Sequence, residues 1–302
     1  MIIIDNLSEG QEDIFVIRIE REEGGTINIL IDGGKSGKRC LEKLKSLKLE
    51  KLDYILLTHI DNDHIQGLLK ILNSNELKYK DTIIIYNKFV NGLISYKQAE
   101  KFEKLIANYE IIVSYKEYQQ SAGEIAFLSM NQRKKLQYDD KKIYITFLSP
   151  NRDIVEKLHV YYNDSKNYGK INSDNAEIVN RSSIVFIIEY QRKAILMCGD
   201  GYIRDIYSYI EELSDGNKTL YPINKFEIIK VPHHGSLENN RELGRMLDKV
   251  ECDKFIITNE DNGNVKIKDE IKKFLSDKKI YCSNECSKFN DLDVEITNQI
   301  NI

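Results

Sequence analysis

The sequence predicts an α/β protein whose mixed β-sheets carry helices on their outer faces. Short runs rich in isoleucine, valine and other apolar residues alternate along the chain with segments of helical periodicity. The first strand candidates follow one another without the long crossovers that parallel pairing requires, so they predict an antiparallel meander. Later strand candidates alternate with helices, and such a mixture is typical of layered α/β architectures.

Apolar runs that are short and bounded by polar or turn residues are the predicted strands. They are 15–19, 27–31, 54–57, 82–86, 143–148, 184–189, 194–197, 228–231 and 255–257. Segments with apolar residues at helical spacing are the predicted helices. They are 38–47, 65–72, 97–107, 203–213, 242–247 and 268–275.

The chain length and the distribution of turn residues predict the domain organisation. A chain of 302 residues fits one large domain or two small ones. It has 3 prolines and no glycine- and serine-rich stretch that would mark a linker. We therefore expect a single domain over 1–302, with inserted segments around 115–140 and 163–180, where the sequence is polar and poorly periodic.

Composition excludes several classes of protein. The 44 basic and 48 acidic residues give a net charge of −4, which argues against a globally basic nucleic-acid-binding surface but not against a local groove. We expect no membrane segment, because no apolar run approaches the roughly 20 residues of a membrane helix. The acidic N-terminus does not resemble a signal peptide. The 5 scattered cysteines favour a reducing, cytoplasmic location.

The strongest chemical signal lies at 58–67, directly after a predicted strand. This segment holds His59, Asp61, Asp63 and His64, although the whole chain has only 5 histidines. Imidazole nitrogen and carboxylate oxygen are the ligands that divalent first-row metals accept. The alternative is a polar surface loop in which Asp63 or Asn62 caps the helix that follows.

Further candidate ligands follow other predicted strands. His233 and His234 come after 228–231, Asp32 ends the strand 27–31, and Asp200 follows 194–197. Both aspartates abut glycine, which lets backbone approach a ligand closely. Taken together, these strand ends predict a binuclear metal site at one edge of the fold.

These motifs resemble the metallo-β-lactamase superfamily. I-D-G-G at 31–34, T-H-x-D-x-D-H-x-x-G at 58–67, G-D-G at 199–201 and H-H-G-S at 233–236 occur in the family's order. H-x-D-x-D-H and K-x-x-H-H-G-S resemble most the hydrolase domain of ComEC-type competence proteins. The turn at 9–13 also fits, loosely, the place of a G-Q-G-D turn in those proteins. The resemblance implies a four-layer αββα sandwich with two mixed sheets.

The resemblance also implies roles for individual residues. His59 and Asp61 would bind the first metal, Asp63 and His64 the second, and Asp200 would bridge the two. One of His233 and His234 would be a ligand and the other would face the substrate. We expect His233 to be the ligand, since it lies nearer the strand end and successive residues of an extended chain point in opposite directions.

Other residues are implied to support the site. Asp63, His234 and Asp32 would form the catalytic group, with Asp32 accepting a hydrogen bond from a ligand histidine. Substrate-contacting or supporting positions are Asn180, Ser182, Ser183, Lys230 and Ser236.

Two departures from the family pattern affect these expectations. No histidine lies near position 180, where most of the superfamily has a third one, so the first metal site is poor in nitrogen. Such a site shifts the preference from Zn²⁺ towards Mn²⁺ or Mg²⁺. The late N-x-y-x-H-P element of the ComEC-type proteins has no match at 261–267, which contains neither histidine nor proline.

The sequence therefore predicts a metal-dependent hydrolase that uses two divalent ions, Zn²⁺ or Mn²⁺ with Mg²⁺ as an alternative, to activate a bridging water. A phosphodiesterase or nuclease acting on nucleic acid is the leading interpretation, because carboxylate-rich binuclear sites suit phosphate substrates. Basic clusters at 35–51 and 133–142 are candidate phosphate contacts. The alternatives are a hydrolase of small esters, thioesters or lactones, and a non-catalytic metal-binding partner subunit. The sequence identifies no protein partner.

Overall fold

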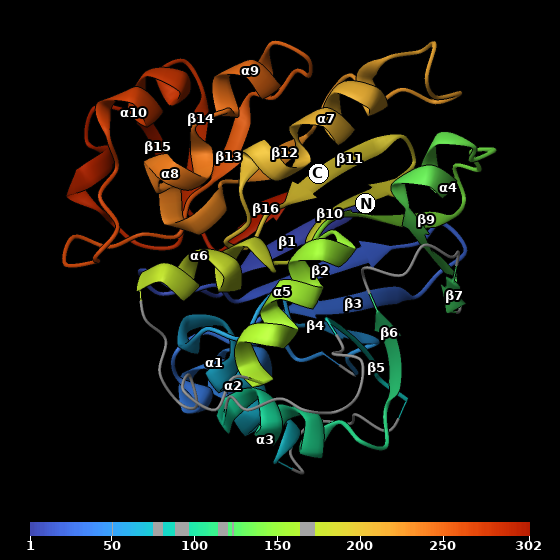
Figure 1. Ribbon diagram of the computed structural model, residues 1–302, viewed down its shortest axis with the longest axis vertical. Coiled ribbons are helices and arrows are strands. Elements are labelled where there is room, and N and C mark those ends of the chain that lie inside the picture. Colours follow the sequence, from blue (N-terminus) through green and yellow to red (C-terminus); the bar gives the residue numbers. More distant parts are fainter. Residues whose placement is uncertain (50, 75–80, 88–96, 114–119, 123, 164–172) are drawn as a thin grey trace.

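Two mixed β-sheets pack face to face in a computed structural model of the chain (Figure 1). The structure describes all residues except 50, 75–80, 88–96, 114–119, 123 and 164–172. In spatial order, the first sheet contains β16 (Gln299–Asn301), β1 (Ile2–Asn6), β2 (Phe15–Glu20), β3 (Thr26–Ile31), β4 (Tyr54–Leu56), β5 (Ile83–Tyr86) and β6 (Glu110–Val113). The second contains β15 (Asp293–Ile296), β14 (Lys279–Cys282), β13 (Lys254–Ile256), β12 (Ile228–Lys230), β11 (Lys193–Met197), β10 (Val185–Tyr190), β9 (Ile143–Ser149), β8 (Ile125–Ser129) and β7 (Gln120–Ala122).

Helices cover the outer face of each sheet. They are α1 (Gly37–Ser46), α2 (Asn62–Leu72), α3 (Lys97–Leu105), α4 (Met130–Lys134), α5 (Arg152–Asn163), α6 (Ser173–Arg181), α7 (Ile203–Ser214), α8 (Leu237–Asn240), α9 (Leu243–Leu247) and α10 (Asp269–Leu275), with short 3₁₀ turns at Pro232–Gly235 and Ser287–Phe289. Figure 1 shows α1, α2 and α3 at the bottom and α7, α9 and α10 at the top, with the strands between them. This arrangement confirms the predicted four-layer αββα sandwich.

Alternation along the strands explains why the layers form. In β2, Phe15 and Ile17 face the core between the sheets, whereas Val16 joins the core beneath the helices. In β10, Phe186 faces the core between the sheets and Ile187 packs under the opposite helices. Both faces of each sheet are covered, so these strands read as continuous apolar runs. The sequence cue that identified them is therefore their length and their polar boundaries.

Pairing within the sheets changes from antiparallel to parallel along the chain. Strands β1, β2 and β3 form the predicted antiparallel meander, and β4, β5 and β6 then add in parallel. In the second sheet, β11 to β15 are all parallel. The loops that follow β3, β4, β11, β12 and β13 carry the polar residues of the site. Parallel order places the carboxyl ends of neighbouring strands at one edge, where α/β proteins commonly bind ligands.

One expected insertion is corrected by the structure. The segment 115–140 contains β8, which pairs in parallel with β9 inside the second sheet, and α4. Ile125 and Phe127 point into the core between the sheets, so this part of the chain belongs to the sandwich itself. In the other expected insertion, 164–172 lie outside the described residues and α6 begins at Ser173. None of the helices that the structure describes is long and apolar enough to cross a membrane.

Candidate metal centre

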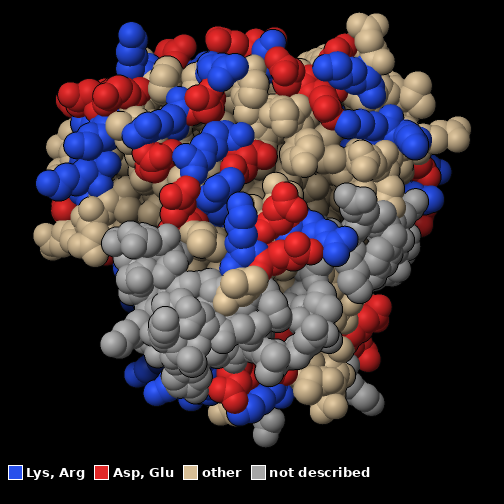
Figure 2. All heavy atoms as spheres, viewed as in Figure 1, with Lys and Arg blue, Asp and Glu red and all other residues tan. Residues whose placement is uncertain are grey.

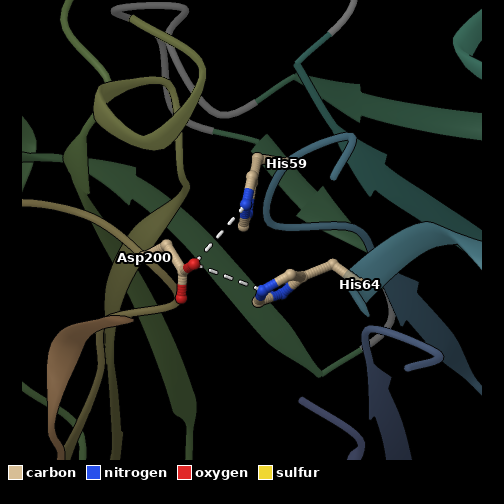
Figure 3. Close-up of side chains that lie close together, drawn as sticks. All are labelled: His59, His64 and Asp200. Carbon is tan, nitrogen blue, oxygen red and sulfur yellow. Dashed lines mark ion pairs between the residues drawn. The ribbon is translucent and has the colours of Figure 1, made fainter. Parts of the chain in front are cut away.

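Loops from both sheets bring the predicted histidines and carboxylates together. Figure 3 shows His59 and His64 pointing toward the carboxylate of Asp200. The two histidines flank the turn between β4 and α2, whereas Asp200 follows β11 in the other sheet. Asp61 is the N-cap of α2, yet its side chain makes no capping hydrogen bond. The carboxylate of Asp61 is therefore available to a ligand, which argues against the purely capping interpretation of this segment.

Two glycines allow α2 to approach β3 closely enough to place His64. A Cβ atom on Gly67 would lie 1.8 Å from the carbonyl oxygen of Gly33, and one on Gly33 would lie 2.3 Å from the backbone nitrogen of Leu68. Any side chain would force the two segments apart. The contact holds Nδ1 of His64 at 2.7 Å from Oδ2 of Asp32. The glycines of both motifs are thus required by the packing of the site.

Asp200 is the carboxylate that the two halves of the site share. Its Oδ2 lies 3.8 Å from Nε2 of His59 and 3.5 Å from Nε2 of His64. Nε2 of His233 is 3.7 Å from the same oxygen. The Asp200 backbone nitrogen donates to Oγ of Ser183, and the Asp200 carbonyl accepts from the amide of Asn239. These bonds orient the residue at the end of β11.

One half of the site is formed by Asp63, His64 and His234, which each place a ligand atom within 4.8 Å of the others. Nε2 of His234 lies 3.8 Å from Oδ2 of Asp63. Both histidines are fully buried, whereas the Asp63 side chain is 25% exposed. Asp63 therefore lies at the opening of the centre and the histidines form its floor.

The other half is formed by His59 and Asp61, with His233 at the rim. Nε2 of His59 lies 3.7 Å from Oδ2 of Asp61. Nδ1 of His233 lies 2.9 Å from Oδ1 of Asn239 and 3.3 Å from Nδ2 of Asn180. The His233 side chain is 26% exposed, so it is the histidine of the site that solvent reaches.

His233 and His234 were expected to point in opposite directions because they would lie in an extended chain, and the structure shows that this reason is wrong. Their φ angles are 44° and 55°, so both are left-handed rather than extended. They nevertheless face different carboxylates, Asp200 and Asp63. His234 is fully buried whereas His233 is partly exposed, so we propose His234 as the ligand, the opposite of the assignment predicted from the strand end.

Hydrogen bonds fix which nitrogen of each buried histidine carries the proton. The Thr58 hydroxyl donates to Asp32 at 2.6 Å, so Nδ1 of His59, 3.1 Å away, must donate to that hydroxyl. By the same logic, the Thr258 hydroxyl donates to Asp13 at 2.7 Å and accepts from Nδ1 of His234 at 2.9 Å. Each Nε2 is then left with a free lone pair, the form that binds metal.

The unpartnered atoms of the site match a bound cation. Nε2 of His59, His64 and His234 and one carboxylate oxygen each of Asp61 and Asp200 are buried without a hydrogen-bond partner. Burying a polar atom without a partner is costly, so such a cluster requires an explanation. Imidazole nitrogen and carboxylate oxygen converging within ligand distance fit divalent metal ions. The residues present therefore suit the group that the motifs imply.

The pKa shifts of Asp200 and His64 also fit a bound cation. Burial opposes the charged form of Asp200, but His233, His64 and His234 outweigh it and hold the pKa of Asp200 well below its ordinary value. Burial also opposes a charged His64, yet Asp200 and Asp32 raise the pKa of His64 well above its usual range. The carboxylates thus attract a positive charge to the position that His64 faces.

The remaining predicted residues support the site. Lys230 is 1% exposed and pairs with Asp13, and its Nζ donates to the Gly199 carbonyl at 2.9 Å, so it is buried away from any substrate. Ser182 donates to the carbonyl of Val179 at 2.6 Å. Ser236 is partly exposed and lies at the edge of the centre, where its backbone nitrogen donates to the carbonyl of His233.

Sequence reasoning missed the supporting roles of Asp13, Thr258 and Asn239. Asp13 is 1% exposed and connects Thr258 with Lys230. The sequence did single out the turn at 9–13 that contains Asp13, but only the fold shows that this turn lies beside β12 and β13. Thr258 and Asn239 follow the strand and the histidine turn at positions that carry no motif.

Comparison with known proteins agrees with the fold. Residues 7–78 match the family model described as metallo-beta-lactamase superfamily. The metallo-beta-lactamase fold protein YhfI from Bacillus subtilis superposes with a TM-score of 0.52 at 14% identity, covering 94% of this chain and 97% of that one. The chain thus has the metallo-beta-lactamase fold, and its match to the family model is confined to residues 7–78.

Curated relatives match over about half of the chain. Ribonuclease Z of Borreliella burgdorferi (strain ZS7) is 32% identical over 160 residues, which are 51% of this chain and 44% of that protein. Ribonuclease Z of Borrelia hermsii (strain HS1 / DAH) is 29% identical over 157 residues, with 51% and 44% covered. The match thus spans less than half the length of these relatives.

Proposed function

We propose that this protein is a metal-dependent nuclease that hydrolyses phosphodiester bonds. The observation that carries the proposal is the convergence of three buried, unpartnered Nε2 atoms on carboxylates, with those of His59 and His64 facing Asp200 and that of His234 facing Asp63. A purely structural role would leave these atoms unsatisfied at a free-energy cost. A non-catalytic scaffold would not need an exposed His233 beside the ligand cluster.

Two divalent ions suit the charge of the centre. Asp13, Asp32, Asp61, Asp63 and Asp200 surround it, and Lys230 is the ammonium group that lies among them. His59, Asp61 and Asp200 would hold one ion, and Asp63, His64, His234 and Asp200 the other. The first set has one nitrogen ligand, which supports Mn²⁺ or Mg²⁺ beside Zn²⁺. Bound ions would supply the Lewis acidity that makes water nucleophilic at neutral pH and stabilises charge on a phosphodiester.

The chain's own residues would orient and complete the site. Asp32, directly and through Thr58, and Asp13, through Thr258, hold each ligand histidine with Nε2 facing inward. His233 lies at the rim with its Nδ1 donating to Asn239, so its Nε2 faces outward from that bond. In the doubly protonated form of the ring, Nε2 can donate to the phosphate or give its proton to the leaving oxygen. Asp63, at the opening, is the carboxylate nearest to an entering substrate.

The substrate class is part of the proposal. The ribonuclease Z relatives make RNA the first substrate to test. The H-x-D-x-D-H and K-x-x-H-H-G-S motifs support a kinship with ComEC-type hydrolase domains, for which DNA is the competing substrate. We also propose that residues 1–302 act as one domain, because both sheets contribute to one centre. Five buried cysteines with free thiols support a reducing, cytoplasmic location.

Metal analysis and a cleavage assay test this function together. The purified protein is incubated with single-stranded RNA and DNA in Mn²⁺, Mg²⁺ or Zn²⁺, with Asp63→Ala as the inactive variant. Asp63 is partly exposed, so its loss opens no core cavity and the variant should stay folded by circular dichroism. We expect cleavage by wild type and none by the variant. Wild type that cleaves neither polymer, or a fully active variant, would contradict the proposal.

A further inference from the structure

A surface cavity of about 420 Å³ opens beside the candidate metal centre. Its lining includes Ser236, Leu237, Lys266 and Lys268. Ser236 stands two positions after His234, and its backbone nitrogen donates to the carbonyl of His233. The cavity is therefore continuous along the chain with the turn that carries both histidines. This is the region for which the sequence offered no counterpart to the family's late histidine element.

The two lysines project from the same side of an extended segment. Residue Ile267 forms an antiparallel bridge with Ser236, which fixes the segment beside the histidine turn. Exposure alternates along it, since Lys266 and Lys268 are exposed and Ile267 is partly buried. In an extended chain, residues two apart share a face. Ile267 consequently anchors the segment while both ammonium groups point outward.

Gly235 is what lets this segment lie so close to the centre. A Cβ atom there would come within 2.2 Å of Cδ1 of Ile267, and its φ of +88° is one that other residues rarely adopt. The segment is also tied to the site by Asn259, whose amide donates to the carbonyl of His234 at 2.8 Å. Lys288 donates to the carbonyls of Gly263 and Val265. The lysines are thus held in a defined place relative to His234.

Lys266 and Lys268 differ from those members of the basic clusters predicted from sequence that form ion pairs. Arg39 and Lys43 both pair with Glu9, and Arg133 is buried against Glu189. In the part of the chain that the structure describes, neither Lys266 nor Lys268 has a carboxylate within ion-pair distance. Figure 2 shows acidic and basic side chains interspersed over the face it displays, as expected for mutually paired charges.

The acidic residue of the cavity is itself neutralised. Glu238 lies 3.6 Å from Nη1 of Arg204 and 2.6 Å from Nη2 of Arg241. It therefore does not cancel the charge of the two lysines. An anion entering the cavity would meet two unpaired ammonium groups and the hydroxyl of Ser236.

We infer that Lys266, Lys268 and Ser236 form a binding subsite for the phosphates of a nucleic-acid strand that extends beyond the scissile bond. This inference rests on the proposed nuclease function and adds the place where the strand is held. Exposed lysines contact phosphates without reading bases, so the subsite confers affinity and no sequence preference. A substrate with a single phosphodiester reaches only the metal centre and does not use it.

The test compares Lys266→Gln/Lys268→Gln with a matched double variant, Lys193→Gln/Lys254→Gln. Lys193 and Lys254 begin β11 and β13, at the end of the parallel strands opposite to the metal centre. Kinetics are measured on a 20-nucleotide RNA and on bis(4-nitrophenyl) phosphate. We expect the KM for RNA to rise about tenfold in the subsite variant, with kcat and the small substrate unchanged. The salt dependence of strand binding should fall by about 1.4 in logarithmic slope, as for two lost phosphate contacts.

Two results would overturn the subsite: an unchanged KM for RNA, or equal losses on RNA and the small substrate. If wild type hydrolyses the small substrate but no polymer, the nuclease proposal fails by itself. In that case, fluorescence anisotropy with the same strand, labelled, measures the affinity of each variant for RNA and tests the subsite. An affinity that both double variants lower equally would refute it, and a tenfold loss confined to Lys266→Gln/Lys268→Gln would support it.

Discussion

His233 and His234 are neighbours in sequence, but the structure supports them in different ways. His234 is fully buried, and its Nδ1 is held by Thr258, which donates to the carboxylate of Asp13. His233 is 26% exposed and its Nδ1 is held by the neutral amide of Asn239. A carboxylate behind a histidine makes its free nitrogen a stronger metal ligand. This difference supports our proposal that His234 binds a metal and His233 faces the substrate.

The same contrast extends to the two halves of the centre. The half containing Asp63 has two buried histidines, His64 and His234, whereas the half containing Asp61 has one, His59. We therefore expect the half containing Asp61 to bind metal more weakly and the half containing Asp63 to retain it. Each of the following variants either removes this asymmetry or makes it measurable.

Asp200→Asn should have the largest effect, because both halves share that carboxylate. We expect kcat/KM to fall by about 1000-fold or more, as the loss of several kcal/mol of charge stabilisation implies. Metal content should drop in both halves. Asp205→Asn, which alters an aspartate of α7 paired with Arg181, is the control and should keep both ions. Two retained equivalents in Asp200→Asn would show that it is not the shared ligand.

His234→Ala and His233→Ala test the comparison directly. The first should lose about one equivalent of metal together with activity, since it removes a buried ligand. The second should keep its metal while turnover falls by about 100-fold, the magnitude typical of a lost proton donor. Metal analysis and steady-state kinetics on both variants decide the matter. Loss of metal in His233→Ala with retention in His234→Ala would reverse the assignment.

Thr258→Val isolates the support behind His234 without touching a ligand. It breaks the connection to Asp13, and we expect metal affinity to weaken by about 10- to 100-fold, as for other residues that orient ligand histidines. Thr146→Val is a matched control, because Thr146 is buried in β9 and its hydroxyl has no hydrogen-bond partner. Competition with a fluorescent chelator measures both affinities. Equal affinities would remove the argument that Asp13 strengthens His234.

Asp61→His should have the smallest effect and in the opposite direction. It adds a nitrogen ligand to the poorer half and restores the commoner superfamily pattern. We expect the weaker of two zinc-binding steps to tighten about tenfold, while the tighter step stays unchanged. Isothermal titration with Zn²⁺ resolves the two steps. Tightening of the stronger step instead would place Asp61 in the other half.

The sequence predicted nine of the described strands and missed β1, β6, β7, β8, β14, β15 and β16. Strands β1 and β8 show why. Strand β1 ends in Asp5 and Asn6, which interrupt its apolar run. Asp5 is satisfied by an ion pair with Arg18 of β2 at 2.6 Å and by a hydrogen bond from the amide of Gln299 in β16 at 3.0 Å. Strand β8 lies within a polar stretch, so its short apolar run was treated as part of an insertion. In both cases, pairing with a neighbouring strand stabilises a strand that the local sequence pattern does not indicate.

The sequence by itself determined which residue types stand at the strand ends. Asp32, Asp200 and the histidine pair each follow a strand directly. Each therefore lies at the end of its strand, at the sheet edge, independently of long-range packing. The register of the motif likewise placed His59 and His64 on either side of one tight turn. These are local properties, because they depend on spacing along the chain and on the strand that precedes each motif.

Only the tertiary structure decided which histidine faces which carboxylate. His234 meets Asp63 across about 170 positions of sequence, and Asp13 reaches Thr258 across 245. The left-handed backbone at His233 and His234 leads into Gly235, which packs closely against Ile267, and no strand pattern indicates either feature. Long-range contacts of this kind arise when two sheets close on each other, so they are set by the packing of the sandwich and not by any single motif.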